Sequence, residues 1–595
     1  MYLSNIRLWN FRCYGQEEFK NEIDLSKPNL DLSFNDKINV LVGENDSGKT
    51  AIIDAIRIVL RTQEYDWYRI ADTDFYSGAN RFRIELRFDD LSDDEAKNFI
   101  EWLSYEKKEN NEEAKVYLRL IYDVKRNDVK IFPSDVCAGS DENGRRLIAE
   151  ARDFLKTTYL KPLRDAASEL SPGRYSRLAS IFYSSSVFNF GRNKTDLQQN
   201  INDFNDSVLE FFSNDEKDGH KIKQIIDGYL KGFIDSERES EIIFSSTDLK
   251  NILSKLELEI KEAINPGLGT LNRLFMAAEL LNLRNDNYEG LRLCLIEELE
   301  AHLHPQAQMK VVERLYRECE KAQLILTTHS PNLASKIKIE NLILCHNSKC
   351  YPLAKEYTKL EENHYVFLKK FLDVTKANLF FAKGLIFVEG WSEQLFLPSF
   401  AEFLKEKEIA KKNLTEAGVS IINVAGTSFL EYVKIFQRKN GDEIDIPVAI
   451  ITDSDVRQYK FSDDKKTVES IDDDKINGEY NEKLERAKGE YDYGNTIKVF
   501  LAKNWTFEFA LYKSSVFSNA FQESVVNVHN KMKRDGKFEE ELAKKLLSGT
   551  LKKTDIAYDL IRKFDDGDFS NVPRAEIEKD DSISYLVEAI KFVCR

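Results

Sequence analysis

The stretch INVLVGENDSGKTAIIDAIRIVL, residues 38–60, decides the fold of the first part of this 595-residue chain. It starts with an apolar run that ends in glycine, and AIIDAIRIVL, residues 51–60, has the spacing of a helix. Between them GENDSGKT, residues 43–50, fits the pattern G-x-x-x-x-G-K-[ST] in the strand–loop–helix context that this motif requires. The stretch therefore predicts a phosphate-binding loop on an α/β scaffold.

The residue types in this loop suit a nucleoside triphosphate. Two glycines let backbone N–H groups curl around phosphates, because a side chain at those positions would block the approach. The lysine would reach the β- and γ-phosphates, and the threonine would hold Mg²⁺. The ATP-binding residues predicted here are Gly43, Asn45, Ser47, Gly48, Lys49 and Thr50.

Two further apolar runs end in residues that could serve the same nucleotide. LRLCLIEELEAHLHP, residues 291–305, ends its strand in Glu297, which would support Mg²⁺, and Glu298, which would polarise the attacking water. QLILTTHSP ends at His329, which can touch a γ-phosphate. Two glutamates could also be helix N-terminal acids, but their occurrence beside a phosphate-binding loop favours the nucleotide role.

A second group of strands ends in carboxylates. LIFVEGWSEQLFLPSF, residues 385–400, runs an apolar strand into Glu389, with Glu393 four residues later. IPVAIITDSDV ends in Asp453 and Asp455, and VFLAKNWTFEFAL supplies Glu508. Helical stretches separate these runs, which predicts a parallel sheet whose carboxyl edge gathers the acids.

Five carboxylates at one edge would repel one another, and hard divalent cations relieve that repulsion. Such a set suits two-metal chemistry on a phosphodiester, with one ion activating water and the other stabilising the leaving oxygen. Taken singly, the glutamates could be first-turn helix acids and the aspartates turn residues. It is much less favoured that none of these five acids belongs to a metal site.

Composition limits the class of protein. The net charge of −16 argues against a surface wholly coated for nucleic acid, although a local basic groove is compatible with it. The sequence has no apolar run of bilayer length and no signal-peptide layout. Seven scattered cysteines favour reduced thiols. We therefore expect a cytoplasmic protein without a membrane partner.

The N-terminal half resembles the ABC-type ATPase heads of RecF and SMC proteins, through the phosphate loop, the two glutamates and the opening IRLWNFRCYGQ. ADTDFYSG lies where that family has its Q-loop, with Asp74 as the nearest match. NPGLGTLNRLF, residues 265–275, corresponds to the signature loop, with Gly267 and Gly269, and departs from the usual Ser-Gly-Gly form. The resemblance implies a dimer in which a partner's signature loop closes on ATP.

The acidic group resembles a Toprim domain, whose pattern VEGWSE and TDSD both match. By that resemblance Glu389 is a metal ligand or general acid/base, and Glu393, Asp453 and Asp455 are metal ligands. VAGTSF matches the intervening strand and turn, where Gly426 would bring backbone close to the metals or the phosphate.

An ATPase head followed by a Toprim domain is the layout of the OLD (overcoming lysogenisation defect) nucleases, which YLKPLRDAASELSPGRYSRL, residues 159–178, also resembles. The resemblance implies a Mg²⁺- or Mn²⁺-dependent DNA nuclease, and several members of the family act in antiviral defence against phages. It also implies a metal-supporting role for Glu508 and a basic residue near the C-terminus against the scissile phosphate. Lys579 is the candidate for that catalytic role, with Arg574 as the alternative.

The predicted fold class is α/β, with an ABC-type P-loop ATPase head, an inserted helical arm and a Toprim domain with a parallel sheet. We expect the head at 1–150 and 263–355, the arm or dimerisation region at 151–262, and the Toprim domain at 380–595. Within the head, RFRIELRF and VYLRLIYDV predict antiparallel strands. The polar residues 458–490 predict an insertion loop.

Three functions are weighed. The leading one is an ATP-binding, metal-dependent DNA endonuclease that forms a homodimer or higher homo-oligomer. The alternative is an ATP-driven DNA-binding or repair scaffold of RecF type, which the complete acid set disfavours. A third, compatible with the first, is a sensor in a defence complex with an RNA or protein partner. DNA versus RNA, and whether ATP activates or restrains cleavage, stay open.

Overall fold

The computed structural model divides into two compact units, residues 1–39 with 49–327, and residues 40–48 with 328–595. The residues that it describes are 1–20, 22–62, 68–106, 114–127, 130–161, 169–173, 176–184, 192–233, 240–242, 249–261, 266–282, 290–441, 443–463 and 467–595. Part of the segment 159–178 and Asn265, the first residue of the predicted signature loop, lie outside the described residues.

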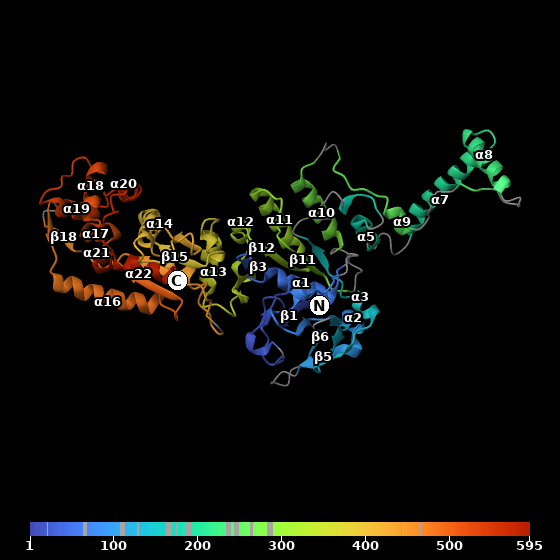
Figure 1. Cartoon of the computed structure of the whole chain (residues 1–595), viewed down its shortest axis with the longest axis horizontal. Coiled ribbons are helices and arrows are strands. Elements are labelled where there is room, and N and C mark those ends of the chain that lie inside the picture. Colours follow the sequence, from blue (N-terminus) through green and yellow to red (C-terminus); the bar gives the residue numbers. More distant parts are fainter. Residues whose placement is uncertain are drawn as a thin grey trace. The chain divides into compact units, whose positions relative to one another are not determined.

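An antiparallel sheet opens the first unit (Figure 1). Its order is β2-β1-β4-β6-β8-β9, with β5 and β7 also paired to β6. The strands are β1 (Tyr2–Trp9), β2 (Leu30–Ser33), β4 (Arg81–Asp89), β5 (Leu103–Glu106), β6 (Lys115–Arg126), β7 (Ile131–Pro133), β8 (Cys137–Ala138) and β9 (Arg145–Arg146). The predicted antiparallel pairing of β4 with β6 is confirmed, in the register Arg81↔Lys125.

A second set of strands in this unit is parallel. β10 (Thr158–Leu160) pairs with β11 (Leu293–Ile296), which pairs with β12 (Gln323–Thr328). All four residues of β11 are buried and apolar, so the strand lies in the core and delivers the two following glutamates to its carboxyl end. The helices α10 (Leu268–Asn282) and α11 (Pro305–Glu318) belong to the same unit.

The predicted arm, residues 151–262, includes strand β10, which pairs with β11 of the head, and its other described elements are helices. It contains α3 (Ala149–Asp153), α5 (Arg177–Ser184), α7 (Arg192–Ser213), α8 (Asp218–Phe233) and α9 (Leu249–Leu253). A buried ion pair joins Arg177 on α5 to Glu279 on α10, with Nη2 2.7 Å from Oε2. α7 packs against α8 (Figure 1). The arm is therefore anchored at its base by a charged pair and extends as a helical hairpin.

The glycine that begins the phosphate loop has a steric reason. Strand β3 (Ile38–Gly43) pairs in parallel with β13 (Leu342–His346), and β13 pairs antiparallel with β14 (Lys349–Pro352). Gly43 has φ of +140°, and a Cβ there would lie 2.1 Å from the carbonyl oxygen of Cys345. Only glycine fits this position, after which the loop leads to α1 (Lys49–Leu60).

A four-stranded parallel sheet forms the centre of the C-terminal part. Its order is β16-β15-β17-β20, and every neighbouring pair is parallel, as the sequence predicted. The strands are β15 (Gly384–Val388), β16 (Val419–Asn423), β17 (Val448–Thr452) and β20 (Ile497–Leu501). Around it lie α14 (Trp391–Glu406), α15 (Phe429–Val433), α17 (Phe507–Lys513), α18 (Ser518–Val528), α19 (Phe538–Leu547), α20 (Lys553–Asp565), α21 (Arg574–Lys579) and α22 (Ser584–Val593).

The sequence predicted an insertion loop at 458–490, and this prediction is wrong. The insertion contains the two-stranded ladder β18 (Tyr459–Phe461) with β19 (Val468–Ser470), followed by the 19-residue helix α16 (Asp473–Tyr491). No residue of α16 is fully buried, and the Asp472 carboxylate caps its first turn. The helix therefore lacks the apolar stripe that sequence periodicity detects.

Candidate functional site

The carboxyl edge of the four-stranded parallel sheet carries the predicted acids. Glu389 directly follows β15 and Asp453 directly follows β17. Glu508 is the second residue of α17, the helix after β20, and Glu393 lies in the first turn of α14. Because parallel strands all end at the same edge, these side chains share one region.

Hydrogen bonds fix two of these carboxylates to the backbone of the neighbouring strand. Oε1 of Glu389 accepts from the Thr452 hydroxyl and, at 2.9 Å, from the backbone N–H of Asp453. Oδ1 of Asp453 accepts from the backbone N–H of Phe507 at 2.7 Å, at the start of α17. The two acids are thus positioned before any ligand arrives.

Burial and mutual repulsion disfavour the charged forms of these acids. Burial, reinforced by Glu508 and Glu389, raises the pKa of Glu393 to about 7. Burial and the charges of Glu389 and Glu508 raise the pKa of Asp453 well above its ordinary value. Burial also raises the pKa of Glu389, against the two hydrogen bonds that it accepts. The group holds more negative charge than its surroundings stabilise.

Asp455 and Gly426 are linked to Glu389. Asp455 is exposed, has φ of 53°, and its charge contributes to the raised pKa of Glu389. The backbone N–H of Gly426 donates to the main-chain carbonyl oxygen of Glu389 at 3.0 Å. The turn after β16 is therefore tied to the end of β15.

Two basic residues that the sequence analysis did not predict reach this cluster: Lys483 donates to the Ser454 carbonyl oxygen at 2.9 Å, and Lys553 pairs with an acid. The Nζ of Lys553 lies 2.8 Å from Oε2 of Glu508. Burial lowers the pKa of Lys553, but the charges of Glu508 and Asp453 outweigh it and raise the pKa above its ordinary value. The predicted Lys579 is instead exposed at the end of α21, and Arg574 pairs with Glu578 at 2.9 Å. Of Lys553, Lys579 and Arg574, Lys553 is the one that pairs with an acid of the cluster.

The donor chemistry fits a hard divalent cation, since every candidate ligand is a carboxylate oxygen. Among the described residues, no three aspartate, glutamate, histidine or cysteine side chains stand in a group that could hold a metal ion. The raised pKa values show what such an ion would change: it would replace the protons that the crowded carboxylates otherwise retain. As the described side chains stand, they do not form a closed ligand set, and Glu393, Asp453, Asp455 and Glu508, with Glu389 beside them, are the carboxylates that could supply ligands to such an ion.

The phosphate loop lies between β3 and α1, as predicted. Gly43 and Gly48 have φ of 140° and 99°, the conformations that favour glycine. Ser47 and Lys49 are buried, whereas Asn45 and Thr50 are exposed. The two glycines therefore give the loop the backbone conformation that its motif requires.

The two glutamates after β11 differ in environment. Burial, with a contribution from Asp54, raises the pKa of Glu297 to about 7, so its charged form needs a cation. Glu298 has φ of 44°, and its backbone N–H donates to the Thr327 hydroxyl at 3.0 Å. His329 follows β12 directly and is half-buried.

Asp74, the predicted Q-loop residue, is occupied by protein groups. Its carboxylate is buried and accepts from the Tyr68 hydroxyl (2.7 Å), the Ala71 backbone N–H (3.0 Å) and Nε of Arg12 (3.0 Å). Arg12 also pairs with Asp54 at 2.8 Å. Asp74 is therefore an anchor for Arg12, which the sequence could not indicate, and its carboxylate is not available to a nucleotide in this structure.

The two glycines of the predicted signature loop have different surroundings. Gly269 lies in the first turn of α10, where a Cβ would be 2.5 Å from the carbonyl oxygen of His302. Gly267 is exposed, with no atom within 4 Å of a Cβ placed there. Gly269 thus serves close packing, and Gly267 is the one accessible to a ligand or partner.

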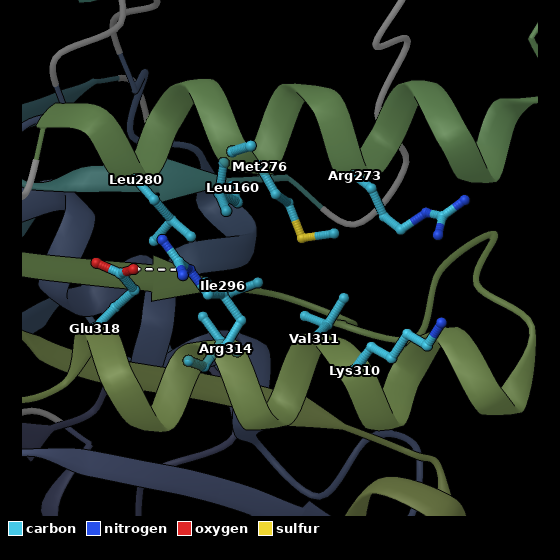
Figure 2. Close-up of a pocket in the computed structure, with 11 residues that line it drawn as sticks. Leu160, Arg273, Met276, Leu280, Ile296, Lys310, Val311, Arg314 and Glu318 are labelled. Carbon is cyan, nitrogen blue, oxygen red and sulfur yellow. Dashed lines mark ion pairs between the residues drawn. The ribbon is translucent and has the colours of Figure 1, made fainter.

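A cavity of about 330 Å³ lies between α10 and α11 in the first unit (Figure 2). Met276 from α10 and Val311 from α11 line it from opposite sides, and Arg314 pairs with Glu318 at 2.9 Å on its wall. None of the predicted ATP or metal residues lines it. We therefore assign neither site to this cavity.

Two protein-family models match separate stretches of the chain, one that includes the phosphate loop and one that includes the first strands of the acidic edge. A family model described as "AAA domain, putative AbiEii toxin, Type IV TA system" matches residues 38–335. Another, "Overcoming lysogenization defect protein-like, TOPRIM domain", matches residues 380–455. Within the described residues, no helix is long and apolar enough to cross a membrane.

Two curated relatives are similar over most of the chain. Endonuclease GajA of Bacillus cereus (strain HuB5-5) is 22% identical over 684 residues, covering 95% of this chain and 96% of that protein. Endonuclease GajA of Bacillus cereus (strain VD045) is 25% identical over 495 residues, covering 77% and 76%. Among solved structures, an SMC head bound to the C-terminal winged-helix domain of ScpA has 16% identity and a TM-score of 0.34, covering 59% of this chain and 96% of that one.

Proposed function

The chain belongs to the OLD-like family, in which an AAA ATPase domain is followed by an OLD-like Toprim domain, and we propose that it is a divalent-metal-dependent DNA endonuclease of antiviral defence. The observation that carries the proposal is the acid cluster at the sheet edge. Burial, reinforced by the charges of neighbouring acids, raises the pKa of Glu389, Glu393 and Asp453. Repulsion of this kind is retained where a metal ion relieves it.

The residues of the cluster divide into two roles. Mg²⁺ or Mn²⁺, when bound, supplies the charge that activates water and stabilises the leaving oxygen of a phosphodiester. Glu393, Asp453, Asp455 and Glu508 would hold the ions. Glu389 is held by the Thr452 hydroxyl and the Asp453 N–H, which fixes its carboxylate in one position to accept or return a proton.

Lys553 supplies the positive charge on the protein side. Its ammonium group sits against Glu508 and is partly exposed, so it can contact a phosphate oxygen without leaving the cluster. We assign to it the role that the family resemblance had placed on Lys579. A DNA backbone entering this edge would meet Lys553 before the buried acids.

ATP is the nucleotide that the head is built to bind. Lys49 and Thr50 would serve its phosphates and Mg²⁺, with Glu297, Glu298 and His329 at the strand ends that follow. Glu297 has a pKa raised to about 7 by burial, which fits a carboxylate whose partner is a cation. ATP would therefore bind at a site separate in sequence from the acids that cleave DNA.

We propose that the arm mediates a homodimer. Helix α8 exposes Ile222, Ile225, Ile226 and Tyr229, which recur at helical spacing and form one apolar stripe. An exposed stripe of this kind marks an interaction surface in a protein that is otherwise highly charged. A second copy of α8 would cover it.

The test is cleavage of supercoiled and linear DNA, and of single-stranded RNA, in Mg²⁺ or Mn²⁺ with and without ATP. Wild-type protein is compared with Asp453→Ala and with Asp473→Ala, an exposed residue of α16. We expect metal-dependent DNA cleavage by the wild type and Asp473→Ala, and none by Asp453→Ala. Full cleavage by Asp453→Ala would remove the assignment. ATP hydrolysis without any cleavage would favour the RecF-type scaffold.

A further inference from the structure

A buried tyrosine hydroxyl lies at the acidic edge of the parallel sheet without a partner. The side chain of Tyr585, the second residue of α22, is only 7% exposed. Its hydroxyl oxygen has no hydrogen-bond partner within the described part of the chain. Burying a hydroxyl unpaired is costly, and a phenylalanine would fill the same space without that cost.

The direction of α22 brings this hydroxyl to the acids. α22 packs on β15, β17 and β20. Its C-terminal end lies at the start of β15, because a Cβ on Gly384 would be 3.2 Å from the carbonyl oxygen of Val593. The helix therefore runs antiparallel to the strands, and its N-terminal end lies at their carboxyl edge.

Contacts just before the helix confirm that placement. Asn504, three residues beyond β20, donates from Nδ2 to the Ser582 hydroxyl at 3.0 Å. The adjacent Lys503 pairs with Asp581 at 2.8 Å. The residues that lead into α22 are thus held at the same edge as Asp453 and Glu508, and Tyr585 follows them by one turn.

We propose that Tyr585 is a positioning residue of the metal site, whose hydroxyl donates a hydrogen bond to a carboxylate of the acid cluster when a cation is bound there. This inference rests on the proposed nuclease function and adds a residue outside the strand-end acids. Ligating carboxylates are commonly held by such a donor, which fixes their orientation toward the metal. A tyrosine is suited to the task because its hydroxyl is rigidly placed by the packed ring.

The acids keep acceptor capacity for this hydroxyl. An ionised carboxylate has about four acceptor positions, and the Phe507 backbone N–H occupies one of those of Asp453.

The experiment compares wild-type protein, Tyr585→Phe and a control, Tyr432→Phe, in the full-length chain. Tyr432 is also buried, but its hydroxyl donates to the Phe371 carbonyl oxygen at 3.4 Å. Melting temperature is measured in EDTA and across a Mn²⁺ titration, and cleavage of supercoiled DNA is measured across the same titration.

We expect Tyr585→Phe to melt in EDTA at the wild-type temperature or above it, because the hydroxyl loses no partner. The Mn²⁺ concentration for half-maximal stabilisation, and that for half-maximal cleavage, should rise about 10- to 100-fold, the range for lost supporting hydrogen bonds. Tyr432→Phe should melt lower in EDTA with an unchanged Mn²⁺ midpoint.

Two results would overturn the inference while the nuclease stands: an unchanged Mn²⁺ midpoint in Tyr585→Phe, or a lower melting temperature of that variant in EDTA. A wild-type protein that neither responds to Mn²⁺ nor cleaves DNA would refute the proposed function itself. The metal-binding readout separates these cases, because it does not depend on catalysis.

Discussion

Replacing Glu393 by glutamine is expected to stabilise the metal-free protein at pH 8 and to abolish its stabilisation by Mn²⁺. The side chain is buried in the first turn of α14, where burial, Glu508 and Glu389 raise its pKa from 4.5 to about 7. Glutamine keeps the shape of the side chain and removes the charge. The same substitution removes a ligand, so stability and function should change in opposite directions.

The size of the effect follows from that pKa. A rise from 4.5 to about 7 corresponds to a penalty of about 3 kcal/mol at pH 8, at about 1.36 kcal/mol for each pH unit. Protonation of a neighbouring carboxylate relieves part of the repulsion in the wild type, so we expect a gain in unfolding free energy of about 1–3 kcal/mol. Because the pKa of Glu393 is higher in the folded state than in the unfolded state, its contribution to stability is fully present below about pH 4.5. That contribution is lost as the pH rises through about 7.

The assay is urea unfolding in EDTA at pH 5 and pH 8, with Glu406→Gln as the matched control. Glu406 lies on the same helix and is exposed, so its replacement should change the unfolding free energy by less than about 0.5 kcal/mol. The reasoning would be refuted if Glu393→Gln lost stability at pH 8, or gained the same amount at both pH values. It would also fail if Mn²⁺ stabilised the variant as strongly as the wild type.

Three further substitutions test separate parts of the chain. Lys553→Ala should lower the cleavage rate at least about 100-fold, since a positive charge against the phosphate is lost, while the exposed Lys579→Ala leaves it unchanged in the same plasmid assay. Lys49→Ala should abolish ATP binding in equilibrium dialysis without removing the metal response of the acid cluster; retained ATP binding would contradict the phosphate-loop assignment. Ile225→Asp on α8 should shift sedimentation toward the monomer, whereas Lys231→Ala on the same helix should not; an unchanged dimer in Ile225→Asp would place the interface elsewhere.

The fold was predictable where local sequence and tertiary structure require the same residues. An apolar strand that ends in Gly43 predicted the phosphate loop, and the structure shows why no other residue fits beside Cys345. The strands before Glu389 and Asp453 are apolar up to their last residues, because both faces of a parallel sheet are buried, so their ends could be located from sequence. Helix α16 was not predicted because none of its residues is fully buried, so its sequence has no apolar stripe.

The candidate site was predictable for residues at strand ends and not for those that reach it from elsewhere. Lys553 begins a helix 45 residues beyond Glu508, and the sequence around it does not distinguish it from the other lysines of the chain. Tyr585 is one of 25 tyrosines, and only the antiparallel course of α22 brings it to the acids. Asp74 shows the converse error, since a motif position gave no sign that Arg12 and Tyr68 would occupy its carboxylate.

The charges of the cluster give one reason for the whole arrangement. Five carboxylates, those of Glu389, Glu393, Asp453, Asp455 and Glu508, follow the strands at one sheet edge, where Lys553 pairs with Glu508 and Lys483 donates to the Ser454 carbonyl oxygen. The acids outnumber these two ammonium groups, and divalent cations would neutralise the remaining negative charge. The apolar core around Phe396, Phe400 and Phe517 holds the strands and helices that carry the acids in place, so their repulsion is retained instead of being relieved by movement. A site held in this way binds cations at the expense of stability without them, which is why removing one acid should strengthen the fold and end the chemistry.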